Sequence, residues 1–268
     1  MNKITNIYNK LGKKILNNGM TQVNKKGTSK FLLNEQIKFY ASDSPFLHNK
    51  YINFENIKHE LIWFLKGSEK INYLHKNKIY YWDKFINEEK IEITNSYPRY
   101  FKTKKWKHIL ESIQSHTPSR NLNLTLHDND MKYSSQSPCI SEIIFNINNN
   151  ELHMTVNQRS ADFCLGLPYD LIMMSLMLNM LCEQYNYDND WSTITFNLTN
   201  IHIYENHISQ ILKQISKIFD IQHNFGNIMF KQNNNNNNNN NLKLIKNAYI
   251  IGKEELEKLP KYLYKLNY

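Results

Sequence analysis

Residues 158–170 read Gln-Arg-Ser-Ala-Asp-Phe-Cys-Leu-Gly-Leu-Pro-Tyr-Asp and are dense in reactive side chains. Arg159, Asp162 and Asp170 place one cation and two carboxyl groups within this short segment. Cys139 follows Pro138 and lies twenty positions before Arg159. A neighbouring cation favours the thiolate, which is the nucleophilic form of cysteine. A thiol, an arginine and two carboxyl groups together indicate covalent chemistry on an anionic substrate.

Length and charge set loose limits. The chain of 268 residues is long enough to bury the core of a single large domain. Its formal net charge of +9 suits a phosphate-bearing ligand or a nucleic acid. However, abundant Lys, Asn, Ile and Tyr with only 7 Gly are also what an AT-rich coding sequence gives. The charge alone therefore does not separate a nucleotide ligand from ordinary solvated lysines.

The cysteines and the apolar runs exclude several protein classes. Cys139, Cys164 and Cys182 form no CxxC pair and no His/Cys cluster with zinc spacing, so we expect neither a disulfide framework nor a metal site. Residues 1–22 lack the apolar segment of a secretory signal, and the apolar run 171–181 is too short to cross a bilayer. We therefore expect a cytoplasmic protein that binds neither membrane nor DNA.

Hydrophobic periodicity predicts a mixed set of elements. Helices are expected at 1–18, 56–65, 68–77, 103–114, 170–184 and 204–218. Strands are expected at 31–39, 141–147, 151–157 and 192–198, the middle two joined as a hairpin. The asparagine tract 233–241 is interpreted as a disordered insertion in a second hairpin. Without regular βαβ alternation, this order predicts one α+β domain over residues 1–268.

Six segments carry a resemblance to the thymidylate synthase and pyrimidine-nucleotide hydroxymethylase superfamily. They occur in the family's order and near its spacings, at 59–67, 81–83, 118–120, 138–139, 158–170 and 200–207. The resemblance implies a large mixed β-sheet that is covered by helices and that dimerises through the sheet. It also implies one-carbon transfer to C5 of a pyrimidine nucleoside monophosphate, with 5,10-methylenetetrahydrofolate as the cofactor.

The chemistry explains why a thiol is needed. C5 of a pyrimidine is a poor nucleophile, and adding a thiolate to C6 turns the ring into an enolate or enamine equivalent. By resemblance Cys139 is this nucleophile, and Glu60 and Tyr97 belong to the network that orders water and moves protons beside the base. From the residues alone, Cys139 could be a small core residue and Glu60 the exposed face of an amphipathic helix.

The resemblance also assigns phosphate contacts. Arg159 and Ser160 match residues that bind the substrate phosphate, and Lys25 stands where the family has an arginine on a loop. Arg120 matches the first of two arginines that family dimers donate across the interface, whereas Asn121 replaces the second. A lysine acts on phosphate as a point charge and lacks the fork of arginine, so the phosphate contacts are weakened.

The sugar and folate contacts follow from the same comparison. His202 and Tyr204 match the pair that hydrogen-bonds the sugar 3′-hydroxyl, and two residues apart on a strand they share a face. The residues that match folate contacts are Lys50, Trp82, Asp162, Leu165, Gly166 and Tyr169. Trp82 could instead be ordinary core, whereas a buried carboxylate at Asp162 needs a partner.

Asp170 departs from the synthases, which carry asparagine there. An amide can donate to uracil O4 and accept from N3–H, whereas cytosine presents a donating amino group and an accepting N3. A carboxyl group suits cytosine, and the cytidylate hydroxymethylases of the superfamily carry aspartate at this position. Ile140 and Phe85 also replace residues that are usual in synthases, a histidine and a tryptophan.

The sequence thus predicts a homodimeric enzyme that hydroxymethylates C5 of a cytidine monophosphate, namely dCMP. One alternative is a thymidylate synthase that methylates dUMP to dTMP. Another is a non-catalytic relative that binds nucleotide or RNA, motivated by the changes at Lys25, Asn121 and Asn53, the last of which stands where a folate-contacting histidine is usual.

Overall fold

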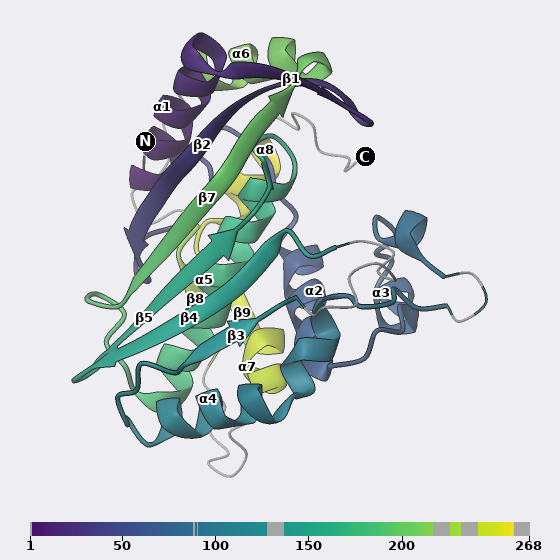
Figure 1. Ribbon diagram of the computed structural model, residues 1–268. Helices are drawn as coiled ribbons and strands as arrows, with labels where there is room; N and C mark the ends of the chain where they lie inside the picture. The colour runs from purple at the N-terminus through teal and green to yellow at the C-terminus, as the bar shows by residue number, and fades with distance from the viewer. Residues whose placement is uncertain are drawn as a thin grey trace.

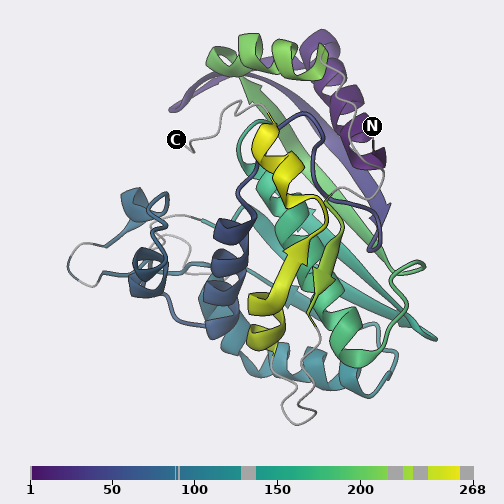
Figure 2. The same ribbon diagram turned by 180° about the vertical axis from the view of Figure 1, so that it is seen from behind.

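The computed structural model describes residues 2–87, 89, 91–127, 137–216, 226–231 and 241–259. Its centre is a seven-stranded sheet in the order β1-β2-β7-β5-β4-β3, with β6 paired to β7 beside this path (Figure 1). Helices pack against one face of this sheet, as the rear view shows (Figure 2). The predicted α+β class with a large mixed sheet is therefore confirmed.

In the central strands of the main sheet, buried side chains alternate with more exposed ones, as a half-buried sheet requires, whereas residues 20–24 at one edge are exposed throughout. Their bounds are β1 Met20–Asn24, β2 Gly27–Tyr40, β3 Asn123–Thr125, β4 Ile140–Asn148, β5 Glu151–Gln158, β6 Ala161–Asp162 and β7 Thr193–Tyr204. A separate antiparallel pair consists of β8 Ile228–Phe230 and β9 Ala248–Ile250. The expected hairpin is β4–β5, whose register pairs Asn148 with Glu151.

Most neighbouring strands are antiparallel, but β7 runs parallel to β5 and β6. A parallel pair needs a crossover connection, and α5 supplies it between β6 and β7. The described part of the chain therefore contains a βαβ unit inside a mostly antiparallel sheet, a feature that the sequence pattern did not reveal. This crossover brings the end of β5, the start of α5 and the end of β7 to one place.

The helices largely follow the predicted periodicity. Their bounds are α1 Lys3–Asn18, α2 Phe54–Lys66, α3 Asn72–Lys76, α4 Lys104–Gln114, α5 Gly166–Tyr185, α6 Ile208–Ser216, α7 Asn241–Asn247 and α8 Lys253–Lys258. Short 3-10 turns are η1 Asp83–Phe85, η2 Tyr97–Lys102 and η4 Glu205–His207. No helix within the described ranges is both long enough and apolar enough to cross a membrane.

Three predicted helix boundaries were wrong. The helix expected at 68–77 shrinks to α3, because Gly67 ends α2 in a left-handed conformation with φ 64° and the chain turns before Asn72. The helix expected from Tyr204 begins at Ile208, because β7 stays paired with β2 as far as Tyr204. Helix α5 begins at Gly166, four residues before the predicted start at Asp170.

Helix α5 is the centre of the core. Nearly all of its side chains from Leu167 to Cys182 are buried, so it is apolar around most of its circumference. The buried hydrophobic residues form one connected cluster that runs from Ile4 near the N-terminus to Leu259. Between Leu167 and Cys182, Asp170 is the one residue of this helix that is only partly buried.

Figure 1 looks onto the opposite face of the sheet, over which no described helix passes. This face carries a polar ladder, defined as Gln36, Asn123, Glu142, Asn157 and Asn197 on five adjacent strands. Amide groups donate along it from Gln36 to Asn197 to Asn157 to Glu142, and Asn123 donates to Glu142 from the other side, each at 2.9 Å. The ladder satisfies polar groups on the uncovered face while the helix-covered face holds the core.

The insertion predicted at 233–241 falls mostly outside the described residues, and Asn241 is the first residue of α7. The tract lies between β8 and β9, which pair as expected for a hairpin.

Candidate active site

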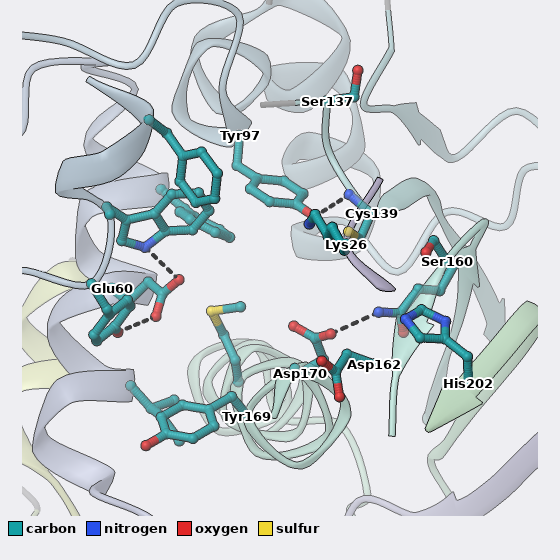
Figure 3. A pocket seen from close by; sticks show the side chains of 18 of the residues that line it. Lys26, Glu60, Tyr97, Ser137, Cys139, Ser160, Asp162, Tyr169, Asp170 and His202 are labelled. Carbon is teal, nitrogen blue, oxygen red and sulfur yellow. Dashed lines mark hydrogen bonds between the residues drawn. The ribbon is translucent and has the colours of Figure 1, made fainter. Parts of the chain in front are cut away.

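A cavity of about 140 Å³ opens where α2, η2, the β5–α5 connection and the end of β7 meet. Helix α2 lines this cavity with Ile57, Glu60 and Phe64, which share one face of the helix. Eleven predicted site residues line it: Glu60, Trp82, Tyr97, Cys139, Ser160, Asp162, Gly166, Tyr169, Asp170, His202 and Tyr204. Most of them are labelled in Figure 3. Residues far apart in the sequence are thus brought to one site.

The remaining predicted residues lie outside this cavity. Lys25 and Arg159 line an adjoining hollow of about 460 Å³, which also contains Ser160, His202 and Tyr204. Lys50 and Leu165 are buried and do not line either space. Arg120 is exposed and lines neither space.

Cys139 is held at the entry to β4. Its backbone N–H donates to the Tyr97 hydroxyl at 2.8 Å, and the N–H of Ile140 donates to the same oxygen at 3.0 Å. Arg159 fixes the segment from the other side, with Nε donating to Pro138 O at 3.0 Å and Nη2 to Ser137 O at 3.1 Å. The predicted neighbours of the thiol are therefore present, and they set the position of its backbone.

The electrostatics of Cys139 are more balanced than the sequence suggested. Burial raises the pKa of the thiol, and the nearby carboxyl of Asp170 raises it further. The charges of Arg159 and Lys26 lower it but do not outweigh burial. The arginine expected to favour the thiolate is in place and is joined by Lys26, but burial opposes the effect of both charges.

Glu60 is buried on α2, and both of its carboxyl oxygens accept hydrogen bonds. Tyr81 donates its hydroxyl to Oε2, and Trp82 donates Nε1 to Oε1 at 3.0 Å (Figure 3). Burial raises the pKa of Glu60 to about 7, although both hydrogen bonds act to lower it. A carboxyl group with a pKa near neutrality can both take up and release a proton at physiological pH.

Asp170 has a similar character on the other side of the cavity. Its Oδ2 accepts a hydrogen bond of 2.7 Å from Nε2 of Gln158, at the end of β5. Burial raises the pKa of Asp170 to about 7, the hydrogen bond from Gln158 lowers it, and the charges of Glu60 and Asp162 raise it. Two carboxyl groups that can hold or release a proton near pH 7 therefore share one pocket.

Asp162 tests whether the pocket fits a folate. Its Oδ1 accepts backbone N–H groups of Cys164 at 2.8 Å and Leu165 at 3.0 Å, whereas Oδ2 is buried and has no partner. A buried carboxylate oxygen without a partner is costly, so this atom suits a ligand with N–H donors. The indole of Trp82 and the ring of Tyr169 line the same cavity. A flat heterocycle with N–H groups fits these residues.

His202 and Tyr204 lie at the end of β7, as the shared face predicted. Their rings meet edge to face with centroids 5.1 Å apart, and both side chains line the cavity and the adjoining hollow. Burial lowers the pKa of His202, which keeps its imidazole neutral at pH 7. A neutral imidazole and a phenol can each donate to or accept from a sugar hydroxyl.

Lys50 and Asn53 stabilise the fold around the site. Lys50 is fully buried and donates to the carbonyl oxygen of Cys164, and burial lowers its pKa to about 8. Asn53 caps α2, because its side chain accepts from the N–H of Asn56 at 3.2 Å. Asp162, Cys164 and His207 offer atoms within 4.8 Å of one another, but the Lys50 ammonium beside them opposes a cation, so we assign no metal there.

Sequence reasoning missed three residues that shape this pocket. Lys26 lines both the cavity and the hollow, whereas only Lys25, its neighbour in the β1–β2 turn, was predicted. Gln158 and Tyr81 hydrogen-bond the two carboxyl groups with pKa values near 7. Gln158 could have been found from the strand alternation in β5, because every second residue from Leu152 to Gln158 is buried. Tyr81 offered no signal beyond its place next to Trp82.

Comparisons with known proteins identify a matching family and several relatives. A family model described as Thymidylate synthase matches residues 6–249. The chain is 30% identical over 222 residues to the thymidylate synthase of Buchnera aphidicola, covering 79% of this chain and 83% of that protein. It is 28% identical over 232 residues to that of Francisella philomiragia, covering 76% and 82%. It is 27% identical over 245 residues to that of Mycoplasma genitalium, covering 78% and 85%.

Proposed function

The chain belongs to the thymidylate synthase family, and within that family we propose that it hydroxymethylates C5 of dCMP. Membership makes it a one-carbon transferase that acts at C5 of a pyrimidine nucleotide with 5,10-methylenetetrahydrofolate. The finer proposal concerns the base that is bound and the group that is left on it. The observation that carries it is the carboxyl group of Asp170 in the pocket.

Cys139 supplies the nucleophile in this proposal. Its sulfur adds to C6 of the base, and the electron pair of the C5–C6 double bond becomes available at C5. The Tyr97 hydroxyl accepts two backbone N–H groups beside Cys139, and burial raises the pKa of Tyr97 well above its usual value. The phenol therefore keeps its proton and can donate it beside the base. The folate, when bound at Asp162 and Trp82, supplies the one-carbon unit.

Asp170 supports cytosine as the base. With a pKa near 7, the carboxyl can accept from the N4 amino group through one oxygen and share a proton with N3. The hydrogen bond from Gln158 occupies Oδ2 and so fixes the orientation of the carboxyl. An ionised Asp170 would instead place an acceptor against uracil O4, at a cost of about 1–3 kcal/mol.

Glu60 supports hydroxymethylation. A hydroxymethyl product takes its oxygen from water, and that water must lose a proton as it attacks. Glu60 lines the same cavity as Cys139 and Asp170, and its pKa of about 7 suits a general base at neutral pH.

The phosphate and the second subunit complete the proposal. Arg159, Ser160 and Lys25, joined by Lys26, would bind the phosphate in the hollow beside the cavity. We further propose a homodimer of single-domain chains that meet through the uncovered sheet face, with Arg120 reaching the partner's phosphate site. The uncovered face, the single connected core and the position of Arg120 outside its own pocket support this arrangement.

The second candidate is methylation of dUMP to dTMP. It is favoured by the names of the relatives reported above, all three of which are thymidylate synthases.

Tritium release from C5 separates the two. The enzyme is incubated with methylenetetrahydrofolate and either [5-³H]dCMP or [5-³H]dUMP, and the released tritium is counted. The mass of the product is then determined by mass spectrometry. Release from dCMP with a hydroxymethyl product supports the proposal. Release from dUMP alone, with a methyl product, establishes the second candidate instead.

A further inference from the structure

The geometry points to Tyr81 as a positioning residue for the reaction. Its hydroxyl holds one oxygen of the Glu60 carboxyl, so that Tyr81 and Trp82 together fix the orientation of that carboxyl in the wall of the cavity. This inference rests on the proposed role of Glu60 in proton transfer. It adds a residue to the site and a reason for the behaviour of Glu60.

The two donors are consecutive residues of one loop and bind different oxygens. Tyr81 takes Oε2 and Trp82 takes Oε1, which leaves the carboxyl without free rotation (Figure 3). The loop itself is well supported, because the Trp82 ring lies 5.5 Å from Trp63 and 5.8 Å from Phe85 between centroids. The N–H of Asp83 also closes a turn onto Tyr80 O at 3.1 Å. Tyr81 is therefore presented to Glu60 by a rigid segment.

The hydrogen bond from Tyr81 also affects the pKa of Glu60. Glu60 is buried, and an ionised carboxyl in that position needs donors. The causes that set its pKa are burial, which raises it, and the hydrogen bonds from Tyr81 and Trp82, which lower it. The other titratable groups that face this cavity are Lys26, Tyr97, Cys139, Asp162, Tyr169, Asp170, His202 and Tyr204. Tyr81 is thus a main reason why Glu60 titrates near neutrality and not far above it.

The test compares Tyr81→Phe with Tyr80→Phe. Both changes remove one hydroxyl and keep the ring, but Tyr80 is 56% exposed and does not line the cavity. In the profile of kcat/KM against pH, the limb that reports Glu60 should move upward by about one pH unit in Tyr81→Phe, the size expected for one hydrogen bond to a carboxylate. Tyr80→Phe should leave the limb in place.

A direct titration keeps this inference separate from the proposed function. Glutamate is labelled with ¹³C at the carboxyl carbon, and the Glu60 signal is identified by its absence in Glu60→Gln. Its midpoint should rise in Tyr81→Phe and stay unchanged in Tyr80→Phe, whatever substrate the enzyme uses. An unchanged Glu60 midpoint in Tyr81→Phe, or an activity loss equal at every pH, overturns the role of Tyr81. Failure of the wild-type enzyme to release tritium from dCMP would instead count against the proposed function.

Discussion

At the scale of single residues, Asp170 combines three properties. It stands on a core helix, it accepts a hydrogen bond from Gln158, and burial raises its pKa to about 7. These properties are linked, because burial on the helix makes the charge of Asp170 costly and the hydrogen bond from Gln158 offsets part of that cost. In the proposed function, Asp170 would therefore contact the base with a protonation state that its burial and Gln158 set.

Asp170→Asn should move the preference from dCMP toward dUMP. An amide can donate to uracil O4 and accept from N3–H, so the ratio of kcat/KM values should change by about tenfold to a hundredfold. Competition between the two labelled nucleotides measures the ratio, and Asp190→Asn at an exposed position is the matched control. An unchanged preference would remove Asp170 from base recognition.

The same substitution should alter the pH dependence of stability. The carboxyl has a pKa of about 7 in the folded protein, against an ordinary value of 3.8. Its contribution to the free energy of unfolding is therefore complete below pH 3.8 and is lost as the pH rises through 7. The free energy of unfolding is measured with urea at pH 5 and at pH 8. From pH 5 to pH 8 the wild type should lose on the order of 3 kcal/mol of this free energy relative to Asp170→Asn. Equal differences at the two pH values would contradict the raised pKa.

At the scale of elements, the sequence predicted what is periodic and missed what depends on contacts. The helices α1, α2 and α4 and the β4–β5 hairpin were found because their apolar residues repeat at the helical or strand period, and α5 was found as a long apolar run. The extension of β7 to Tyr204 was not found, because it depends on pairing with β2 some 160 residues earlier. Local pattern carries no information about such a partner.

The site divides in the same way. Eleven of the predicted residues line one cavity, and all of them except Tyr97 could be chosen because they lie in the six segments that carry the resemblance. Lys26 could not be chosen over Lys25 by sequence, since both precede Gly27 and only the backbone of the turn decides which enters the cavity. The role of Tyr81 needs the three-dimensional approach of its loop to α2.

Helix α2 supplies a prediction at this scale. Gly67 ends it at φ 64°, and a Cβ there would lie 2.8 Å from the Cβ of Lys102. Gly67→Ala should reduce the free energy of unfolding by about 1–3 kcal/mol, measured by urea titration. Gly67→Asn should cost less, because asparagine tolerates the left-handed conformation. Equal losses would show that the contact with Lys102, and not the backbone, sets the cost.

At the scale of the whole molecule, the uncovered sheet face would be exposed in a monomer and covered in the proposed dimer. If Arg120 acts on the partner's substrate, Arg120→Ala and Cys139→Ser should each lose most activity, for different reasons. Mixing and refolding the two variants should restore one complete site in each mixed dimer. Random pairing then gives roughly a quarter of the wild-type activity.

Sedimentation is the companion measurement, since a dimer of 32.1 kDa chains has twice that mass. Two inactive parents that stay inactive after mixing, although they sediment as dimers, would show that Arg120 does not serve the neighbouring site.

The placement of Asp170 on α5 also bears on how this specificity could evolve. The genetic code separates aspartate from asparagine by one nucleotide, and the two side chains have nearly the same size. Since the surrounding helix is held by other side chains, a single point mutation in the gene could exchange one nucleotide pool for another while the protein still folds.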